Sequence, residues 1–247
     1  MKAFKALFRS EFKLCLRDMN IPFFGIGMPI IVVLIIGLVN GGASAAQGAS
    51  VGVMEQSFGA FAAIAICATG LMGLPLQVAD YRHRKILKRF MVTPVSPGLL
   101  LFVQMLVNLM MSVISLVLIY IICAAFWGYG MAGSVGWFAL AYLLVLFAMY
   151  SIGMMLASVA PNMKTANLMC TLVYFPMLFF SGATIPYEIM PKAAQSVMDV
   201  LPLTQGIKLM KAASLGMPAE NAIVAVAVLV PVAVVCLVLS VKLFKWE

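Results

Sequence analysis

Six long, uncharged apolar runs constrain the fold of this chain more than any other feature of its sequence. A helix needs about 20 mostly apolar residues to cross a bilayer. Backbone polar groups inside a membrane must be hydrogen-bonded within the protein, so uniform runs of this length predict helices rather than barrel strands. The runs are Ile21–Val39, Gln56–Ala79, Gly98–Trp127, Val135–Ala160, Thr165–Tyr187 and Asn221–Val241. We therefore expect an all-α polytopic membrane protein with six transmembrane helices, folded as one domain over residues 1–247.

The composition supports this fold class and excludes two others. Of the 247 residues, 64% are apolar and 10% are charged, whereas a soluble domain carries about 25% charged residues. A disordered chain, in turn, needs low hydrophobicity. The five cysteines are dispersed without a Cys-x-x-Cys pair, and His83 is the only histidine. We therefore expect neither a disulfide framework nor a metal centre.

The basic residues lie mainly at one end of the six runs. Lys192, Lys208 and Lys211 fall on one side, and the other 13 lysines and arginines fall on the opposite side. The positive-inside rule then predicts that both termini are cytoplasmic, in a multi-pass protein of the cell membrane. The net charge of +8 is explained by contact with anionic lipid headgroups rather than nucleic acid. The charged first 20 residues do not resemble a cleaved signal peptide.

Two basic segments have helical periodicity. In residues 1–20, basic side chains share one face and apolar ones the other, which predicts an interfacial helix. Glu11 and Asp18 interrupt the apolar face, so we expect them to contact protein rather than lipid. Residues 80–92 form the second segment. This segment is either a loop that sets the membrane orientation or a docking helix for a cytosolic partner.

The segment 181–219 is too apolar for a free loop and contains several prolines. Two short helical pieces fit between those prolines, and we expect them to cap the outer end of the bundle or to form a re-entrant pair. Just before them, Pro176 interrupts an aromatic run and Gly182 permits a sharp turn. The aromatics either pack or form an outer gate. The candidate gate residues are Tyr174, Phe175, Phe179, Phe180 and Gly182.

Several kinds of chemistry are missing from the sequence. No Gly-x-x-x-x-Gly-Lys-[Ser/Thr] motif is present, so the chain has no P-loop to bind ATP. None of the eight acidic residues lies deep within an apolar run. An acid in that position usually marks a proton or ion pathway. The sequence therefore argues against a proton-driven antiporter and against a membrane-embedded enzyme.

One motif points to a family. The run Phe179-Phe180-Ser181-Gly182-Ala183-Thr184-Ile185-Pro186 is followed by Pro191 and then by Leu201-Pro202-Leu203-Thr204. Together with the six-run layout, this pattern resembles the permease subunit of a type-2 ABC exporter, a superfamily that exports drugs, lipids and polysaccharides. The resemblance covers nearly the whole chain. Family members often begin their coupling helix with an acidic, Gly-Thr-containing stretch, whereas this chain has Asp80-Tyr81-Arg82-His83. That departure implies an acid-rich partner surface or a shifted docking contact.

The resemblance implies a complex of two permeases, identical or related, with two separate ATPase subunits that bind ATP and Mg. No cofactor is expected on this chain. Residues 80–92 then correspond to the coupling helix, which is followed by Thr93-Pro94-Val95-Ser96-Pro97. The residues expected to contact the ATPase or to hold the helix in place are Arg82, Arg84, Lys85, Leu87, Lys88, Arg89 and Phe90.

The function implied by the resemblance is ATP-driven export of a small hydrophobic or amphipathic compound, such as a drug, an antibiotic or a lipid-like molecule. The substrate would leave the inner leaflet or the cytosol along a path beside runs one, two and five. Two alternatives remain. A secondary carrier would work without ATP, and a structural membrane protein would need neither an ATPase nor a gate.

Overall fold

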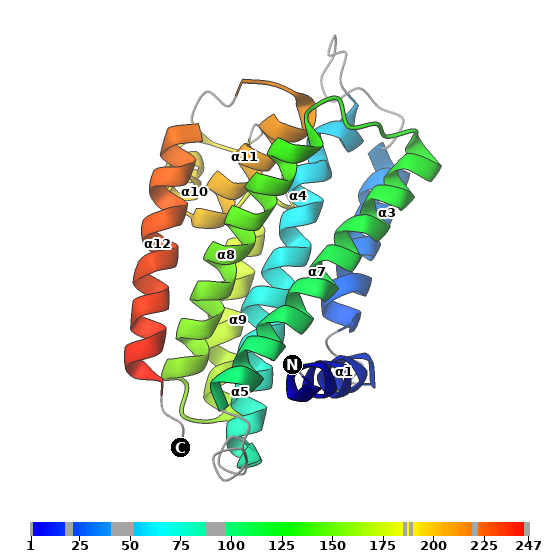
Figure 1. Cartoon of the computed structure of the whole chain (residues 1–247). Coiled ribbons are helices and arrows are strands. Elements are labelled where there is room, and N and C mark those ends of the chain that lie inside the picture. Colours follow the sequence, from blue (N-terminus) through cyan, green and yellow to red (C-terminus); the bar gives the residue numbers. More distant parts are fainter. Residues whose placement is uncertain are drawn as a thin grey trace.

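The computed structural model describes residues 2–17, 22–40, 52–86, 97–184, 187, 190–218 and 222–244. Every regular element in these residues is helical, as the apolar runs predicted, and two of them, η1 and η2, are π-helical. Long helices pack side by side into a bundle, and α1 lies across one end of it (Figure 1). The elements are α1 (Lys2–Arg17), η1 (Phe23–Gly27), α3 (Met28–Asn40), α4 (Val53–Cys67), η2 (Ala68–Gly73), α5 (Leu74–His83), α7 (Pro97–Trp127), α8 (Val135–Val159), α9 (Met163–Phe180), α10 (Lys192–Met198), α11 (Pro202–Leu215) and α12 (Ala222–Leu243).

Within the described residues, five helices are long and apolar enough to cross a membrane. They are Val53–His83, which joins α4, η2 and α5, then Gly98–Trp127, Val135–Val159, Met163–Phe180 and Ala222–Leu243. The first apolar run forms a shorter helix, Phe23–Val39, which at 1.5 Å per residue falls a few ångströms short of a hydrocarbon core about 30 Å thick. Five of the six expected spans are thus found as long apolar helices, and a six-span topology stays a prediction.

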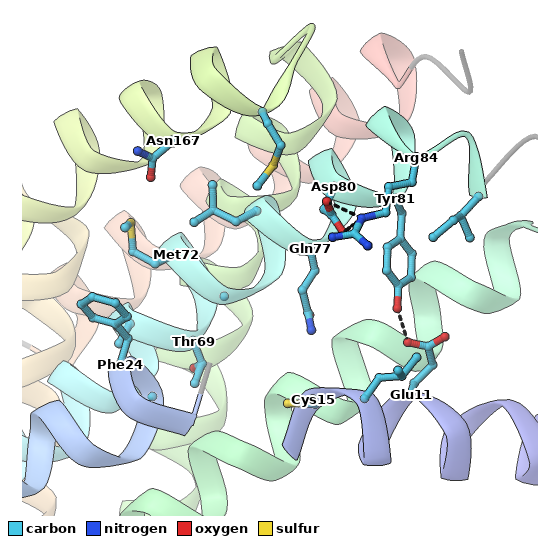
Figure 2. Close-up of a pocket in the computed structure, with 17 residues that line it drawn as sticks. Glu11, Cys15, Phe24, Thr69, Met72, Gln77, Asp80, Tyr81, Arg84 and Asn167 are labelled. Carbon is cyan, nitrogen blue, oxygen red and sulfur yellow. Dashed lines mark hydrogen bonds and ion pairs between the residues drawn. The ribbon is translucent and has the colours of Figure 1, made fainter. Parts of the chain in front are cut away.

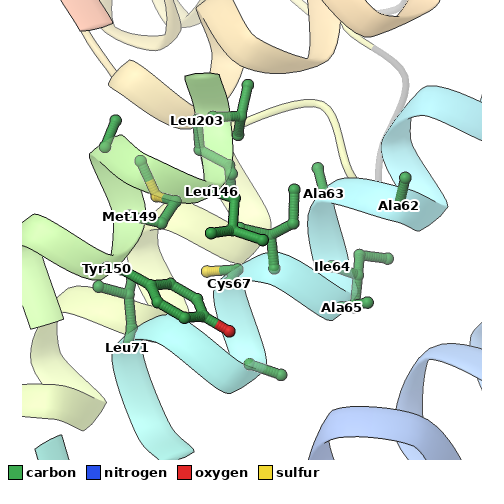
Figure 3. Packing of buried hydrophobic residues seen from close by; sticks show 14 of the residues in the cluster. Ala62, Ala63, Ile64, Ala65, Cys67, Leu71, Leu146, Met149, Tyr150 and Leu203 are labelled. Carbon is green, nitrogen blue, oxygen red and sulfur yellow. The ribbon is translucent and has the colours of Figure 1, made fainter. Parts of the chain in front are cut away.

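The second span forms the centre of the bundle. Its segment α4 is almost entirely buried, and Figure 3 shows Ala63 and Cys67 of α4 packed beside Leu146 and Tyr150 of α8. Small residues permit this close packing, as is usual between membrane helices. At the crossing of η2 and α8, a Cβ on Gly153 would lie only 2.0 Å from the backbone oxygen of Gly70.

The two π-helical segments face each other. Gly25 of η1 lies against Thr69 of η2, where a Cβ on Gly25 would meet the Thr69 methyl group at 3.0 Å. The Thr69 hydroxyl donates back to the Ala65 carbonyl at 2.9 Å and accepts from the Tyr150 hydroxyl at 3.0 Å. These bonds satisfy the hydroxyl groups of Thr69 and Tyr150 where the backbone changes from the α-helical to the π-helical hydrogen-bond pattern. Single π-helical turns occur frequently at functional sites.

The fifth apolar run is shorter as a helix than its sequence suggested. Helix α9 ends at Phe180 rather than near Tyr187, because Ser181 and Gly182 form a turn in which Gly182 has φ +84°. The turn at Gly182 is therefore confirmed. Two short helices follow, α10 and α11, and they lie at the end of the bundle opposite α1 (Figure 1).

An ion pair ties these short helices together. Lys208 of α11 contacts Asp199 at 2.6 Å, and its ammonium lies 3.9 Å from the centre of the Tyr187 ring. The Tyr187 hydroxyl donates to the same carboxylate at 3.1 Å. Tyr187, the end of α10 and helix α11 thus contribute to one cluster.

Candidate functional site

The amphipathic helix α1 is fastened to the bundle by its apolar face. Phe8, Phe12 and Cys15 pack against Val107 and Met111 of α7. The basic side chains of the opposite face are exposed, namely Lys5, Arg9, Lys13 and Arg17. The two-faced helix predicted from the sequence is present, and its apolar face contacts protein.

The one described acid of α1 is anchored by two other helices. Glu11 is only 6% exposed, and its carboxylate accepts hydrogen bonds from Tyr81 of α5 and Gln104 of α7. Gln104 also donates to the Tyr81 hydroxyl at 3.0 Å. Burial raises the pKa of Glu11 above its ordinary value, although the two hydrogen bonds oppose that shift. The expectation that Glu11 contacts protein is confirmed, whereas Asp18 lies outside the described residues.

Beside this anchor lies a cavity of about 820 Å³. It is partly open and is lined by α1, the π-helical segments η1 and η2, α5 and the first turns of α9. Figure 2 shows Glu11, Tyr81, Asp80 and Arg84 at one end of the cavity, and Phe24 at the other. The cavity is therefore amphipathic, with charged side chains at one end and uncharged, partly apolar side chains at the other.

Polar groups also line the middle of the cavity. Gln77 extends from α5 toward α1 (Figure 2), and its side-chain oxygen accepts a hydrogen bond of 2.7 Å from Asn108 of α7. That bond orients the Gln77 amide so that its nitrogen is the donor for a molecule in the cavity. Thr69 and Asn167 also line the cavity, at the end where Phe24 lies (Figure 2). Apart from α1, the helices around the cavity come from apolar runs one, two and five, beside which the sequence analysis expected the substrate path.

The predicted coupling helix over residues 80–92 differs from the structure at its start. Residues 80–83 are the last turn of α5. The helix is then interrupted, because Lys85 adopts a left-handed conformation with φ +56°. Of the expected contact residues, Arg84 and Lys85 are exposed, and Arg84 is ion-paired with Asp80 at 2.8 Å. The others, Leu87, Lys88, Arg89 and Phe90, lie outside the described residues.

Arg82 makes its described contacts with the bundle. One of its guanidinium nitrogens donates to the carbonyls of Ala157 and Ala160 at 3.1 and 2.7 Å. The guanidinium also lies 5.2 Å from the centre of the Phe244 ring. Arg82 therefore joins α5 to the last turns of α8 and α12. Its sequence position gave no sign of this, since it is one of several basic residues in a row.

The candidate gate residues gather at the other end of α9. Tyr174 is 3% exposed, whereas Phe175, Phe179 and Phe180 are exposed. Phe175 and Phe179 stack with ring centres 6.2 Å apart. Helix α9 has 18 residues, so about 27 Å separates its two ends. The structure thus keeps the gate candidates apart from the cavity and from the turn at Lys85.

Comparison with known proteins agrees with this architecture. The family model for the ABC-2 type transporter matches residues 2–215. Nodulation protein J of Rhizobium leguminosarum bv. viciae is 35% identical over 120 residues, which cover 47% of this chain and 46% of that protein. The inner membrane transport permease YhhJ of Escherichia coli (strain K12) is 31% identical over 135 residues, which cover 53% of this chain and 35% of that protein.

The matched segments therefore span less than half the length of these relatives. The family model, by contrast, extends from α1 through α11 and includes every helix that lines the cavity. Taken with the apolar helical bundle, this match shows that the chain belongs to the ABC-2 type transporter family.

Proposed function

We propose that this chain is the permease of an ATP-driven exporter that moves a small amphipathic compound out of the cell. The amphipathic cavity between α1, η1, η2, α5 and α9 carries this proposal. Its volume of about 820 Å³ falls within the range of small-molecule sites, which are mostly apolar with a few placed polar groups. Family membership favours an ATP-driven system over a secondary carrier or a structural protein.

The cavity end of the bundle is proposed to face the cytoplasm. It carries the exposed basic face of α1 together with Arg84 and Lys85, and basic residues concentrate on cytoplasmic surfaces. Helix α1 would then lie on anionic headgroups of the inner leaflet. The name of the relative YhhJ, an inner membrane transport permease, agrees with a location in the cell membrane.

The partner ATPase is proposed to dock at the turn that ends α5. Arg84 and Lys85 are exposed there, and two further basic residues follow closely in the sequence. A push on this turn would act on α5, which continues through η2 into α4 as one helix, Val53–His83. Residues of both α5 and η2 line the cavity. Movement at the ATPase contact would thus change the shape of the substrate site.

A second permease copy is proposed to complete the path. The exposed aromatic side chains Phe175, Phe179 and Phe180 of α9 would then meet their counterparts and close the route at the outer side. The turn at Gly182 would allow this end of α9 to move.

Binding of an uncharged fluorescent amphiphile tests the cavity directly. Purified full-length permease in nanodiscs should bind N-phenyl-1-naphthylamine. Met72→Trp should weaken that binding, because Met72 lines the cavity and indole would occupy its volume. Leu143→Trp, at an exposed position on α8, is the matched control and should bind as the wild type does. Equal binding by Met72→Trp and wild type would refute the cavity as the substrate site.

Coupling needs a separate measurement with the ATPase subunit present. Arg84→Glu should reduce substrate-stimulated ATP hydrolysis while the permease remains folded. Lys192→Glu, at the other end of the bundle, should leave stimulation unchanged. Salt should weaken the association, since exposed charges carry it. Full stimulation in Arg84→Glu would place the ATPase contact elsewhere.

A further inference from the structure

We propose that the cavity selects amphipathic organic cations, with Glu11 as the carboxylate that receives the cationic group. This inference names the substrate class of the site and rests on the proposed function. It follows from the balance of charges in the cavity, from the position of Glu11 and from the separation between the charged and apolar ends.

The charges around the cavity do not cancel. Among the described residues that line it, two are carboxylates, Glu11 and Asp80, and one is a cation, Arg84. Arg84 is already paired with Asp80 at 2.8 Å. Glu11 receives hydrogen bonds from Tyr81 and Gln104, which are neutral donors. With its carboxylates ionised, the described lining therefore has one negative charge in excess.

Glu11 is also buried enough for that charge to matter. It is 6% exposed, and an ionised carboxylate is unfavourable in such surroundings unless a cation compensates it. Burial raises the pKa of Glu11, and a bound cation would favour the ionised form. Binding of an anionic compound would be unfavourable, because the one guanidinium in the described lining is already paired with Asp80.

The rest of the cavity suits the apolar part of such a molecule. Phe24 and Met72 line the cavity, and Figure 2 shows both at the far side from Glu11. Methionine adapts its shape to different apolar groups. Gln77 lies between the two ends and can donate to a polar atom in the middle of the ligand.

Two probes of nearly the same shape and opposite charge test the proposal. Tetraphenylphosphonium and tetraphenylborate compete with N-phenyl-1-naphthylamine for full-length permease in detergent. We expect the cation to displace the dye and the borate to displace it at least tenfold less well. Glu11→Gln should weaken phosphonium binding about tenfold or more, because it removes a charge-assisted contact. Binding of the uncharged dye is measured in the same variant, so that the loss specific to the cation is given by the ratio of the two affinities.

Further variants keep the test independent of any loosening of α1. Arg84→Gln should strengthen phosphonium binding, because it releases Asp80 from its ion pair. Glu55→Gln is the matched carboxylate control, since Glu55 lies at the start of α4 and does not line the cavity. Each variant is judged by the ratio of its phosphonium affinity to its dye affinity, which compensates for any change in the folded fraction.

The outcomes separate this inference from the proposed function. Equal displacement by the two ions, or an unchanged ratio in both Glu11→Gln and Arg84→Gln, would overturn cation selection while dye binding still supports the cavity. Dye binding that survives Met72→Trp would overturn the cavity itself. Opposite changes of the ratio in Glu11→Gln and Arg84→Gln, with Glu55→Gln unchanged, would establish selection for cations.

Discussion

Substitution of Gly153 by alanine should destabilise the protein by separating η2 from α8. The added Cβ would lie 2.0 Å from the carbonyl oxygen of Gly70 and 3.3 Å from a ring carbon of Pro75. The Gly70 oxygen and carbon that this Cβ would approach are both backbone atoms, so rotation of a side chain cannot relieve these contacts. Contacts of a real Cβ below 3.0 Å are essentially unknown, and the two helices must therefore move apart by about 1 Å in a close-packed interior.

The cost can be bounded from the effects of overpacking. Inserting a methyl group into a well-packed core costs roughly 1–3 kcal/mol, and the rigid partner places Gly153→Ala near the upper end of that range. For a domain of this size, the unfolding midpoint should fall by roughly 2–12 °C. Because η2 also lines the cavity, binding of the uncharged dye should weaken in the same variant.

The cysteines of the chain provide the assay. All five are buried thiols, so a fluorogenic maleimide reacts with them only as the protein unfolds. Gly136→Ala is the matched control on the same helix, since its Cβ would meet only the Ser134 hydroxyl at 3.7 Å. Equal midpoints for Gly153→Ala and Gly136→Ala would refute the view that this crossing is held by backbone contact.

Three further predictions concern α1 and α9. Tyr81→Phe should weaken the docking of α1 by about 1–3 kcal/mol, because it removes a donor from the buried Glu11 carboxylate; faster maleimide labelling of Cys15 in a single-cysteine background would show it. Docked α1 binds the Glu11 proton more tightly than undocked α1, because docking raises the pKa of Glu11 above its ordinary value of 4.5. The docking of α1 should therefore weaken as the pH rises from 4.5 to the raised pKa, and should change no further above it. Glu11→Gln should abolish that dependence, with labelling normalised to denatured protein at each pH. Gly182→Val should reduce export per folded molecule more than Gly128→Val does, although both glycines have positive φ; equal rates would assign only a structural role to the α9 turn.

The sequence allowed the helices to be predicted because their physical cause is local. Uncharged runs identified the long spans, and Gly182 identified the turn after α9 because a positive φ strongly favours glycine. The acid at position 11 also stood out, since it interrupts an otherwise apolar face. In these cases one residue and its neighbours in the chain determine the outcome.

Other features depend on partners far away in the chain. The interruption after α5 occurs at Lys85, where the sequence has neither glycine nor proline to indicate the end of a helix. Arg82 finds its acceptors at Ala157 and Ala160, more than 70 residues away. The cavity exists because α1 docks on α7 beside η2, and no composition or periodicity encodes that arrangement. The π-helical turns could not be recognised from the sequence either, because they are as apolar as the runs that contain them.

The continuous helix Val53–His83 has a mechanical consequence. Its tightest contact, Gly70 with Gly153, lies partway along it, with roughly 20 Å of helix on one side and roughly 25 Å on the other. A rigid rod held at such a fulcrum behaves as a lever, so its two ends move in opposite directions and by similar amounts. Inward displacement at Lys85 would then be accompanied by outward displacement near Val53. Spin labels at the two ends would record this as distance changes of opposite sign.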